Sequence, residues 1–203
     1  MSLLFREKRA LPAWLERPPP APRPACVPAR GFSPAEELII QLLAQAGESE
    51  PRIVQFVGCA PGDVSAAVPR AVAVAAALWL GRTLLLALTA SGTEDADPSP
   101  VPDASVAGLF HAQLAASPAG WVGGDVRTGE GLRALQADFP VVLLDGTALG
   151  PTPWCLHLAP FCGGTVVLAA AGRSEKSRIL ATARGVVAAK GHVFGLVLTG
   201  PLA

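Results

Sequence analysis

Short apolar runs alternate with amphipathic or alanine-rich stretches from residue 33 to the end of the chain. The runs have the length and the β-branched content of buried strands, and the stretches between them have the length of helices. Strands and helices that alternate in this way pack as right-handed βαβ units. The pattern therefore predicts an α/β fold, a three-layer arrangement in which a parallel sheet is flanked by helices. We expect its strands near residues 53, 83, 141, 165 and 194.

Helix positions follow from capping residues and from periodicity. Ser33 as N-cap, Pro34 at the first helical position and Glu36 two residues further form a capping box, and the helix should run to about Gly47. A short strand is expected around Trp121. The other expected helices cover residues 65–80, 105–116, 129–137, 154–158 and 174–190.

The first 32 residues differ in composition from the rest. Residues 1–17 mix Leu, Phe and Trp with basic side chains, which is typical of an amphipathic segment that docks on a membrane surface or on a partner. A disordered tail is the alternative interpretation, and termini are commonly loose. Residues 18–28 are proline-rich and predict an extended spacer. We therefore divide the chain into an N-terminal segment with its linker, 1–32, and a domain, 33–203.

One apolar stretch has the length of a membrane span. Residues Ala71–Ala90 are almost wholly apolar, and length alone would allow a transmembrane helix. Gly81 and Arg82 interrupt the stretch at its middle, where an arginine in lipid is costly. We therefore interpret it as the end of a helix followed by a buried strand.

Composition narrows the classes of partner. Apolar residues make up 51% of the chain and charged residues 16%, and the formal net charge is zero. This balance does not indicate a nucleic-acid surface, so a protein partner is expected. The four cysteines form no regular disulfide framework, and no signal peptide opens the sequence. We expect a cytoplasmic protein, with residues 1–17 as a candidate contact to the inner face of the membrane.

The centre of the domain is the stretch 53–66, in which a β-branched run meets a Gly/Pro turn and then opens an alanine-rich helix. In nucleotide-binding α/β domains, backbone N–H groups of such a turn wrap a phosphate. A P-loop requires G-x-x-x-x-G-K-[ST], in which the lysine binds the β- and γ-phosphates. Here Val64, Ser65 and Ala66 occupy the positions of the last glycine, the lysine and the hydroxyl residue. The frame of a phosphate loop is therefore present without its catalytic groups.

Several stretches resemble the cytoplasmic P-loop domain of the bacterial tyrosine kinases of capsule and exopolysaccharide export, relatives of the MinD/ParA ATPases. The family motif S-x-x-P-G-E-G-K-S-T lies over Gly58–Ala67, where Pro61 and Gly62 match. The strand that ends at Asp145 resembles Y-D-x-V-I-I-D-T-P-P, and two further matches lie at 164–174 and 192–200. The resemblance covers roughly residues 33–203 and implies a degenerate P-loop NTPase-like fold.

The resemblance also implies where a nucleotide site would lie. Asp145 would hold magnesium in an active relative; here it could equally cap the following loop. The family's second-strand acids and its base-reading asparagine are replaced by Ala87, Thr89 and Thr199, and the chain contains no tyrosine. We therefore expect no catalytic residue, no metal and no cofactor, as in a pseudo-ATPase or pseudokinase. The degenerate nucleotide site would consist of Gly58, Pro61, Gly62, Ser65 and Asp145.

The expected function is that of a non-catalytic scaffold or regulatory subunit of a bacterial exopolysaccharide synthesis or secretion complex. It would act by binding a protein partner in a membrane-associated complex, and a homo-oligomer is compatible with this. The family's oligomerisation motif E-x-x-R-x-x-R has Ile39 and Leu42 at its arginine positions, which argues against polar self-assembly of that kind. The alternatives are a MinD/ParA-like positioning protein and a weak nucleotide-binding enzyme.

An unrelated chemistry is also open. Cys155, His157 and Cys162 lie within eight residues, and thiolate plus imidazole can bind zinc or form a nucleophile-base pair. The spacing C-x-H-x4-C is not a usual zinc pattern, and a helix would turn Cys155 and His157 to different sides. Core packing is the alternative reading, because free cysteine is among the most buried residue types.

Overall fold

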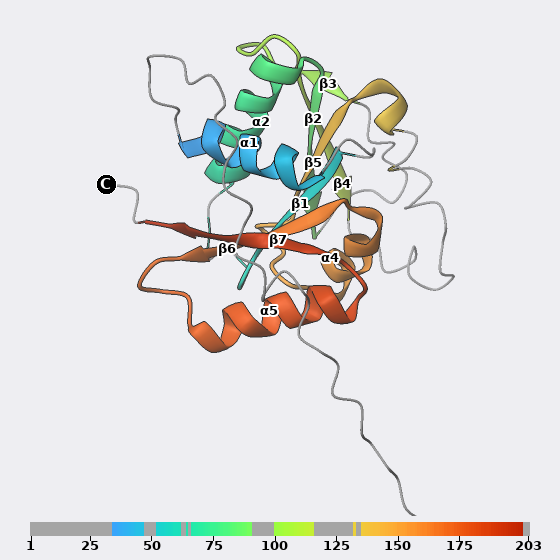
Figure 1. The fold of residues 1–203 in the computed structure, drawn as a ribbon. Helices are drawn as coiled ribbons and strands as arrows, with labels where there is room; N and C mark the ends of the chain where they lie inside the picture. Colours follow the sequence, from blue (N-terminus) through green and yellow to red (C-terminus); the bar gives the residue numbers. More distant parts are fainter. Residues whose placement is uncertain are drawn as a thin grey trace, which may run out of the picture. The chain divides into compact units, whose positions relative to one another are not determined.

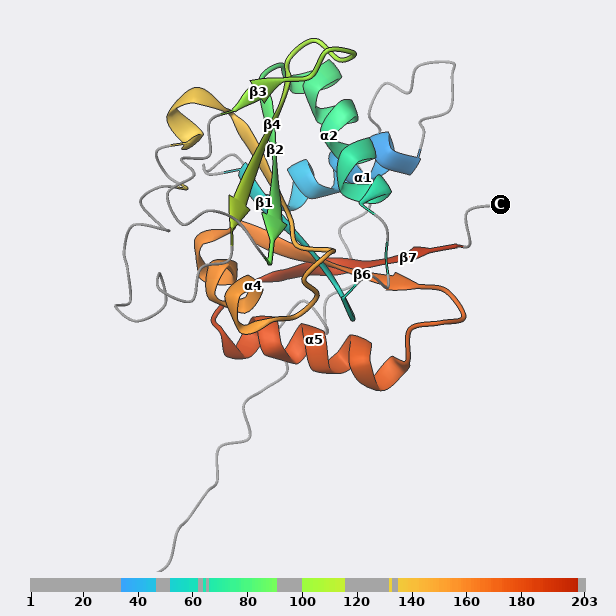
Figure 2. The same ribbon diagram turned by 180° about the vertical axis from the view of Figure 1, so that it is seen from behind.

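The computed structural model describes residues 34–46, 52–61, 64, 66–90, 100–115, 132 and 135–200. These residues form a seven-stranded sheet with helices on both faces (Figures 1 and 2). The strands are β1 (Arg52–Gly58), β2 (Thr83–Thr89), β3 (Val101–Pro102), β4 (Leu109–Ala115), β5 (Val141–Asp145), β6 (Gly164–Ala170) and β7 (Val193–Thr199). The helices are α1 (Pro34–Ala46), α2 (Ala67–Leu80), α4 (Pro153–Leu158) and α5 (Lys176–Ala188), with a 3-10 turn at Ala159–Phe161.

The sheet confirms the predicted α/β fold class. Its order is β3-β4-β2-β5-β1-β6-β7, and every neighbouring pair is parallel except β3 and β4. All five strands expected from the apolar runs are members. Strands β5 and β6 are buried along their whole length, which is why their sequences are almost wholly apolar.

Each face of the sheet carries its own hydrophobic core. Along β1, Val54 and Phe56 point to the core shared with α1 and α2, while Ile53 and Val57 point to the core shared with α4. This alternation is the period of two that a strand imposes on its side chains. Strand β1 is therefore held by packing on both of its faces, and the loop that follows it starts from a rigid position.

The helix predicted over residues 105–116 is wrong. Residues 109–115 form β4, which pairs with the edge of β2, and β3 adds an antiparallel strand that the sequence pattern did not predict. The buried residues Leu109 and Ala112 are three positions apart, which is the spacing of a helix face. The segment forms a strand because its backbone hydrogen-bonds to β2. Leu132 and residues 135–138 are helical, within the helix expected at 129–137. The expected strand near Trp121 and the whole N-terminal segment 1–32 lie outside the described residues.

The apolar stretch 71–90 does not form one helix. Helix α2 ends at Leu80, Gly81 takes a φ of 84° and β2 begins at Thr83. The Arg82 guanidinium lies over the rings of Phe110 and Phe139, at 5.3 and 5.1 Å from their centroids, so the charge in the middle of the stretch stacks on aromatic faces. Within the described part of the chain, no helix combines the length and the apolar character that a membrane crossing requires.

Candidate functional site

The candidate site lies where the carboxyl ends of β1, β5 and β6 meet. Strand β1 lies between β5 and β6 in the sheet. After β1 the chain passes through α2 to β2, on the β5 side of β1. After β5 it crosses over to β6, on the opposite side of β1. The connections therefore diverge at β1, and α/β sheets bind their ligands at such a point. Gly58 ends β1, and Asp145, which pairs in register with Phe56, ends β5.

The loop after β1 packs closely on the loop after β5. A Cβ on Gly58 would lie 3.2 Å from the carbonyl oxygen of Ala60 and 3.4 Å from that of Thr147. Gly150 has a φ of 64°, and a Cβ there would come within 2.8 Å of the Pro61 nitrogen. Two glycines thus allow the backbones to approach. The structure brings Gly58, Pro61 and the end of β5 together, while Gly62 and Ser65 lie outside the described residues.

The carboxylate of Asp145 is buried and holds its own loop. One oxygen, Oδ1, accepts hydrogen bonds from the backbone nitrogen of Thr147 at 3.0 Å and from the Thr147 hydroxyl at 2.6 Å. The two side chains are 7% and 2% exposed. The capping role considered from the sequence is therefore observed, and Oδ1 is engaged within the protein.

The remaining positions of the nucleotide site carry apolar groups. Val64 is 5% exposed and packs in the core beside α1 and α2. On β2, Ala87 pairs in register with Asp145, and Leu88 is 1% exposed. Among the described residues at this edge, no lysine stands in the loop after β1, and no carboxylate stands at the end of β2. The cation that would neutralise a phosphate and the carboxylate that would hold magnesium are therefore missing from these two places.

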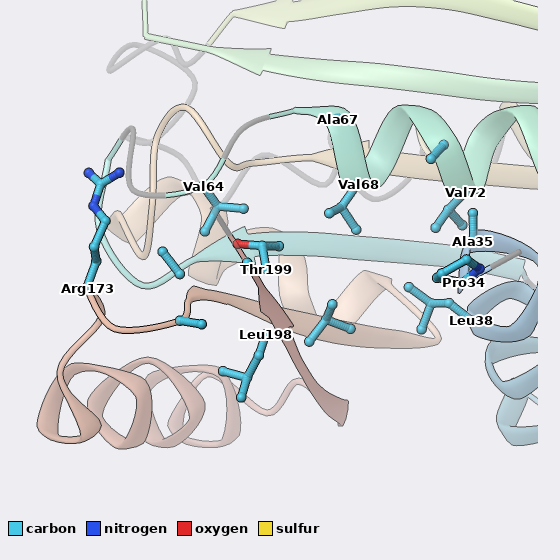
Figure 3. A pocket seen from close by; sticks show the side chains of 15 residues that line it. Pro34, Ala35, Leu38, Val64, Ala67, Val68, Val72, Arg173, Leu198 and Thr199 are labelled. Carbon is cyan, nitrogen blue, oxygen red and sulfur yellow. The ribbon is translucent and has the colours of Figure 1, made fainter. Parts of the chain in front are cut away.

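Next to the loop lies a groove of about 620 Å³ (Figure 3). It is bounded by the start of α1, the first turns of α2 and the ends of β6 and β7. Of the side chains that line it, only Arg173 and Thr199 are polar. The Thr199 hydroxyl donates to the Ala169 carbonyl at 3.3 Å. The lining residues are Pro34, Ala35, Leu38, Val64, Ala67, Val68, Ala71, Val72, Ala170, Ala171, Arg173, Val197, Leu198, Thr199 and Gly200.

Sequence reasoning missed this groove. The small residues Ala67 and Ala71, on one face of α2, read as ordinary core-facing positions. The available signal was their combination with Ala170 and Ala171 at a strand end, because small side chains facing each other leave space between elements. Only the fold shows that these positions face one another.

Cys155, His157 and Cys162 do not form a site. Cys155 is fully buried, whereas His157 is exposed and its ring meets Phe161 edge-on, with centroids 5.9 Å apart. Burial raises the pKa of Cys155 to about 11, and it raises the pKa of Cys162 still further. Both are therefore thiols at neutral pH, not the thiolates that act as nucleophiles or metal ligands. The described residues contain no cluster of His, Cys, Asp and Glu with the geometry of a metal site.

A buried polar network connects these elements instead. The Gln55 amide nitrogen donates to the Cys155 carbonyl at 2.8 Å, and its oxygen accepts from the Thr165 hydroxyl at 3.1 Å. Gln55 and Thr165 are both 0% exposed. The network therefore links β1 to α4 and β6 below the candidate site.

The fold matches solved structures of kinase domains. The kinase domain of the Escherichia coli tyrosine kinase ETK matches with a TM-score of 0.69 and 12% identity, over 83% of this chain and 76% of that one. The BceF tyrosine kinase domain matches with a TM-score of 0.62 and 18% identity, over 82% of this chain and 76% of that one. The VpsO kinase domain matches with a TM-score of 0.60 and 13% identity, over 82% of this chain and 95% of that one. The chain shares the fold of bacterial tyrosine-kinase domains.

This kinase-domain fold confirms the predicted resemblance at the level of structure. No protein-family model and no curated protein matches the sequence significantly. The likeness is therefore one of fold. What the site can do depends on the residues of this chain.

Proposed function

We propose that the chain is a non-catalytic component of a bacterial exopolysaccharide synthesis or secretion complex, and that it works by binding a protein partner. The exopolysaccharide context rests on the sequence resemblance to the export kinases, and the kinase-domain fold supports it. The observation that carries the proposal is the apolar groove, which lies beside a phosphate-type loop without phosphate-binding charges.

Phosphoryl transfer depends on electrostatic stabilisation by cations and by magnesium. Val64 and Ala87 carry no charge, and Ser65 cannot replace a lysine. For a phosphate, backbone N–H groups and the helix dipole remain, which contribute about 0.3–1 kcal/mol when exposed. Arg173, at the edge of the groove, is the one cationic side chain among the lining residues. This argues against turnover and favours a role in binding.

The groove suits a few apolar side chains rather than a whole domain. Its volume of about 620 Å³ falls in the range of small-ligand sites, roughly 300–1,000 Å³. Val68 and Val72 of α2 and Leu38 of α1 form much of its wall. The partner therefore presents a short apolar segment, and in this context it belongs to the membrane-associated complex.

A bulky residue placed in the groove tests the proposal. Ala171 is exposed and lines the groove, so Ala171→Trp should fill part of it without disturbing the core. Ala188→Trp, on the exposed side of α5 and away from the groove, is the matched control. In a strain that lacks the gene, the wild type and the control should restore both polymer secretion and the co-purified complex, and Ala171→Trp should restore neither. Full restoration by Ala171→Trp would overturn the groove as the partner site.

Calorimetry with ATP and magnesium tests the non-catalytic part independently. We expect no measurable binding and no turnover, because the loop lacks the P-loop lysine, the end of β2 lacks carboxylates, and Arg173 is the one charged side chain among the residues that line the groove. Micromolar affinity would overturn this part and favour the alternatives, a weak nucleotide-binding enzyme or a MinD/ParA-like positioning protein.

A further inference from the structure

Strand β7 forms a free edge of the sheet. Among the described residues it pairs only with β6. Natural proteins usually protect such an edge with charged residues, a proline or a very short strand. β7 has seven residues, Val-Phe-Gly-Leu-Val-Leu-Thr, without a charge or a proline. Leu196 and Leu198 are 47% and 61% exposed.

Both leucines lie on the α5 side of the sheet. In register, Leu196 pairs with Val167 and Leu198 with Ala169, and these β6 residues belong to the small core that includes Ile179 of α5. Neighbouring residues in register share a face of the sheet. In Figure 3 the Leu198 side chain, at the border of the groove, accordingly extends towards α5.

Helix α5 adds apolar side chains beside them. Leu180 and Val187 are 44% and 58% exposed, and residues seven positions apart lie on the same side of a helix. Gly185 contacts Leu156 of α4, and at about 100° per residue Leu180 and Val187 fall on the opposite flank, towards the β7 edge. We call Leu180, Val187, Leu196 and Leu198 the β7-α5 patch. They are four of the seven large apolar side chains that are exposed in the described part of the chain.

The backbone of this edge offers donors and acceptors. The Thr199 carbonyl accepts from the Ala171 nitrogen at 2.8 Å, so residue 199 points its backbone groups to β6. Successive residues of a strand point theirs to opposite sides, which directs the N–H and C=O groups of Leu198 and Leu196 away from β6. These groups are placed to pair with another strand.

We propose that the β7-α5 patch is the interface of a twofold-symmetric dimer, in which β7 pairs antiparallel with β7 of a second copy. Leu196 would stand opposite the second copy's Leu198, a register that uses all the outward backbone groups of both leucines. The α5 flanks would meet with Leu180 against the second copy's Val187. Lys176 and Lys190, which are exposed near the ends of α5, stay in solvent at the rim.

A second copy fits better than an isolated peptide. The patch has two layers, a strand edge and a helix flank, and an added peptide strand would cover only the first. In a twofold-symmetric dimer the same surface of each copy contacts the other, so β7 would contact β7 and α5 would contact α5. None of the four patch residues is charged. The exposed Arg184, one turn after Leu180 on α5, points further towards solvent than Leu180 and Val187, so its long side chain would stay at the rim of the interface. Leu198 also lines the groove proposed for the partner, whereas Leu180, Val187 and Leu196 do not. Oligomeric state and partner binding are measured separately, so the two proposals can still fail independently.

The oligomeric state of the full chain tests the dimer. Light scattering coupled to gel filtration should show a dimer for the wild type and a monomer for Leu198→Lys. Leu198→Pro should also be monomeric, because proline removes the outward N–H while the bonds to β6 remain. Leu78→Lys, at a residue of α2 that is 69% exposed, is the matched control and should stay dimeric. Circular dichroism confirms that each variant is folded.

Three results would overturn the proposal: a monomeric wild type at the highest soluble concentration, a dimeric Leu198→Lys variant, or a Leu78→Lys variant that dissociates as well. Cross-linking tests the register. A mixture of Leu196→Cys and Leu198→Cys proteins should form a disulfide-linked dimer faster than either protein alone, because antiparallel neighbours come within disulfide range. Equal rates in all three samples would contradict the antiparallel pairing.

Discussion

Thr147 donates two hydrogen bonds to a single oxygen of Asp145, from its backbone nitrogen at 3.0 Å and from its hydroxyl at 2.6 Å. Both residues are buried at the carboxyl end of the sheet. The carboxylate that would hold magnesium in an active relative thus shapes the loop that packs on Ala60 and Pro61.

Asp145→Ala should therefore destabilise the fold. It leaves a buried N–H and a buried hydroxyl without an acceptor, which costs about 1–3 kcal/mol. Asp145→Asn keeps an acceptor oxygen and should cost less. Urea unfolding measures both, with Asp138→Ala at an exposed position as control. If Asp145→Ala were as stable as the wild type and yet abolished function, a nucleotide or metal mechanism would replace the scaffold.

Restoring the phosphate loop should recover binding but not catalysis. The triple variant Val64→Gly, Ser65→Lys and Ala66→Thr returns the lysine and the hydroxyl of a P-loop. Ala87 and Thr89 would still lack carboxylates, so turnover should stay undetectable. Calorimetry with ATP and a phosphate-release assay measure the two effects, and the same variant with alanine at position 65 is the control. Turnover in the triple variant would show that the second-strand acids are not needed.

The strands were predictable where burial is complete. β5 and β6 are buried on both faces, so nearly every position is apolar and the runs stand out. β4 is only partly buried, and its buried Leu109 and Ala112 have a helix-like spacing beside the exposed Gln113. Its strand conformation comes from pairing with β2, which local sequence does not encode.

The candidate site was predictable in part for a related reason. An Asp side chain commonly accepts a hydrogen bond from the backbone two residues further on, so the contact between Asp145 and Thr147 could be expected from these neighbouring residues alone. The groove joins residues of α1, α2, β6 and β7, which lie up to 166 positions apart, from Pro34 to Gly200. No local pattern reports on such a juxtaposition.

The effects of removing Gln55 and Thr165 on stability should not be additive, because the two side chains are hydrogen-bonded to each other. Gln55→Leu leaves the Cys155 carbonyl and the Thr165 hydroxyl buried without the partner that they have now, at about 1–3 kcal/mol for an unsatisfied group. In Gln55→Leu with Thr165→Val one of these groups is gone, so the double variant should be more stable than the sum of the two single changes. A double-mutant cycle of urea midpoints measures the coupling. Strict additivity would contradict the network.

The cysteines near α4 should react slowly. Burial raises the pKa of Cys155 to about 11, so at pH 8 little thiolate is present and access is blocked. A disulfide reagent should modify Cys155 in the folded protein far more slowly than in denaturant. Because the folded pKa lies above the unfolded one, the protonated thiol favours the fold below the unfolded value of about 8.5, and stability falls as pH rises towards 11. Rapid labelling of Cys155 in the native protein would support the hypothesis that it acts as a nucleophile.

Asp103 should make the fold sensitive to acid. The Ser105 hydroxyl at 2.6 Å is the main hydrogen bond that holds the pKa of Asp103 well below its usual range, and His111 Nε2, also at 2.6 Å, adds to it. Arg70 of α2 reaches the same carboxylate at 3.2 Å, so one group joins α2 to the β3-β4 turn and to β4. Because the folded pKa lies below the unfolded one, the ionised carboxylate favours the fold above about pH 4, and this contribution is lost as the pH falls further.

Asp103→Asn should remove that dependence. The amide cannot ionise, so the variant should be less stable than the wild type at neutral pH, and the difference should shrink as the pH falls from about 4 to 2. Urea midpoints measured across this range give the comparison. Asp138→Asn, at an exposed position with no hydrogen bond of this kind among those described, should follow the wild-type curve. If the Asp103→Asn curve ran parallel to that of the wild type down to the lowest pH, the carboxylate would not be ionised in the fold, and its bonds to Ser105 and His111 would not be charge-assisted.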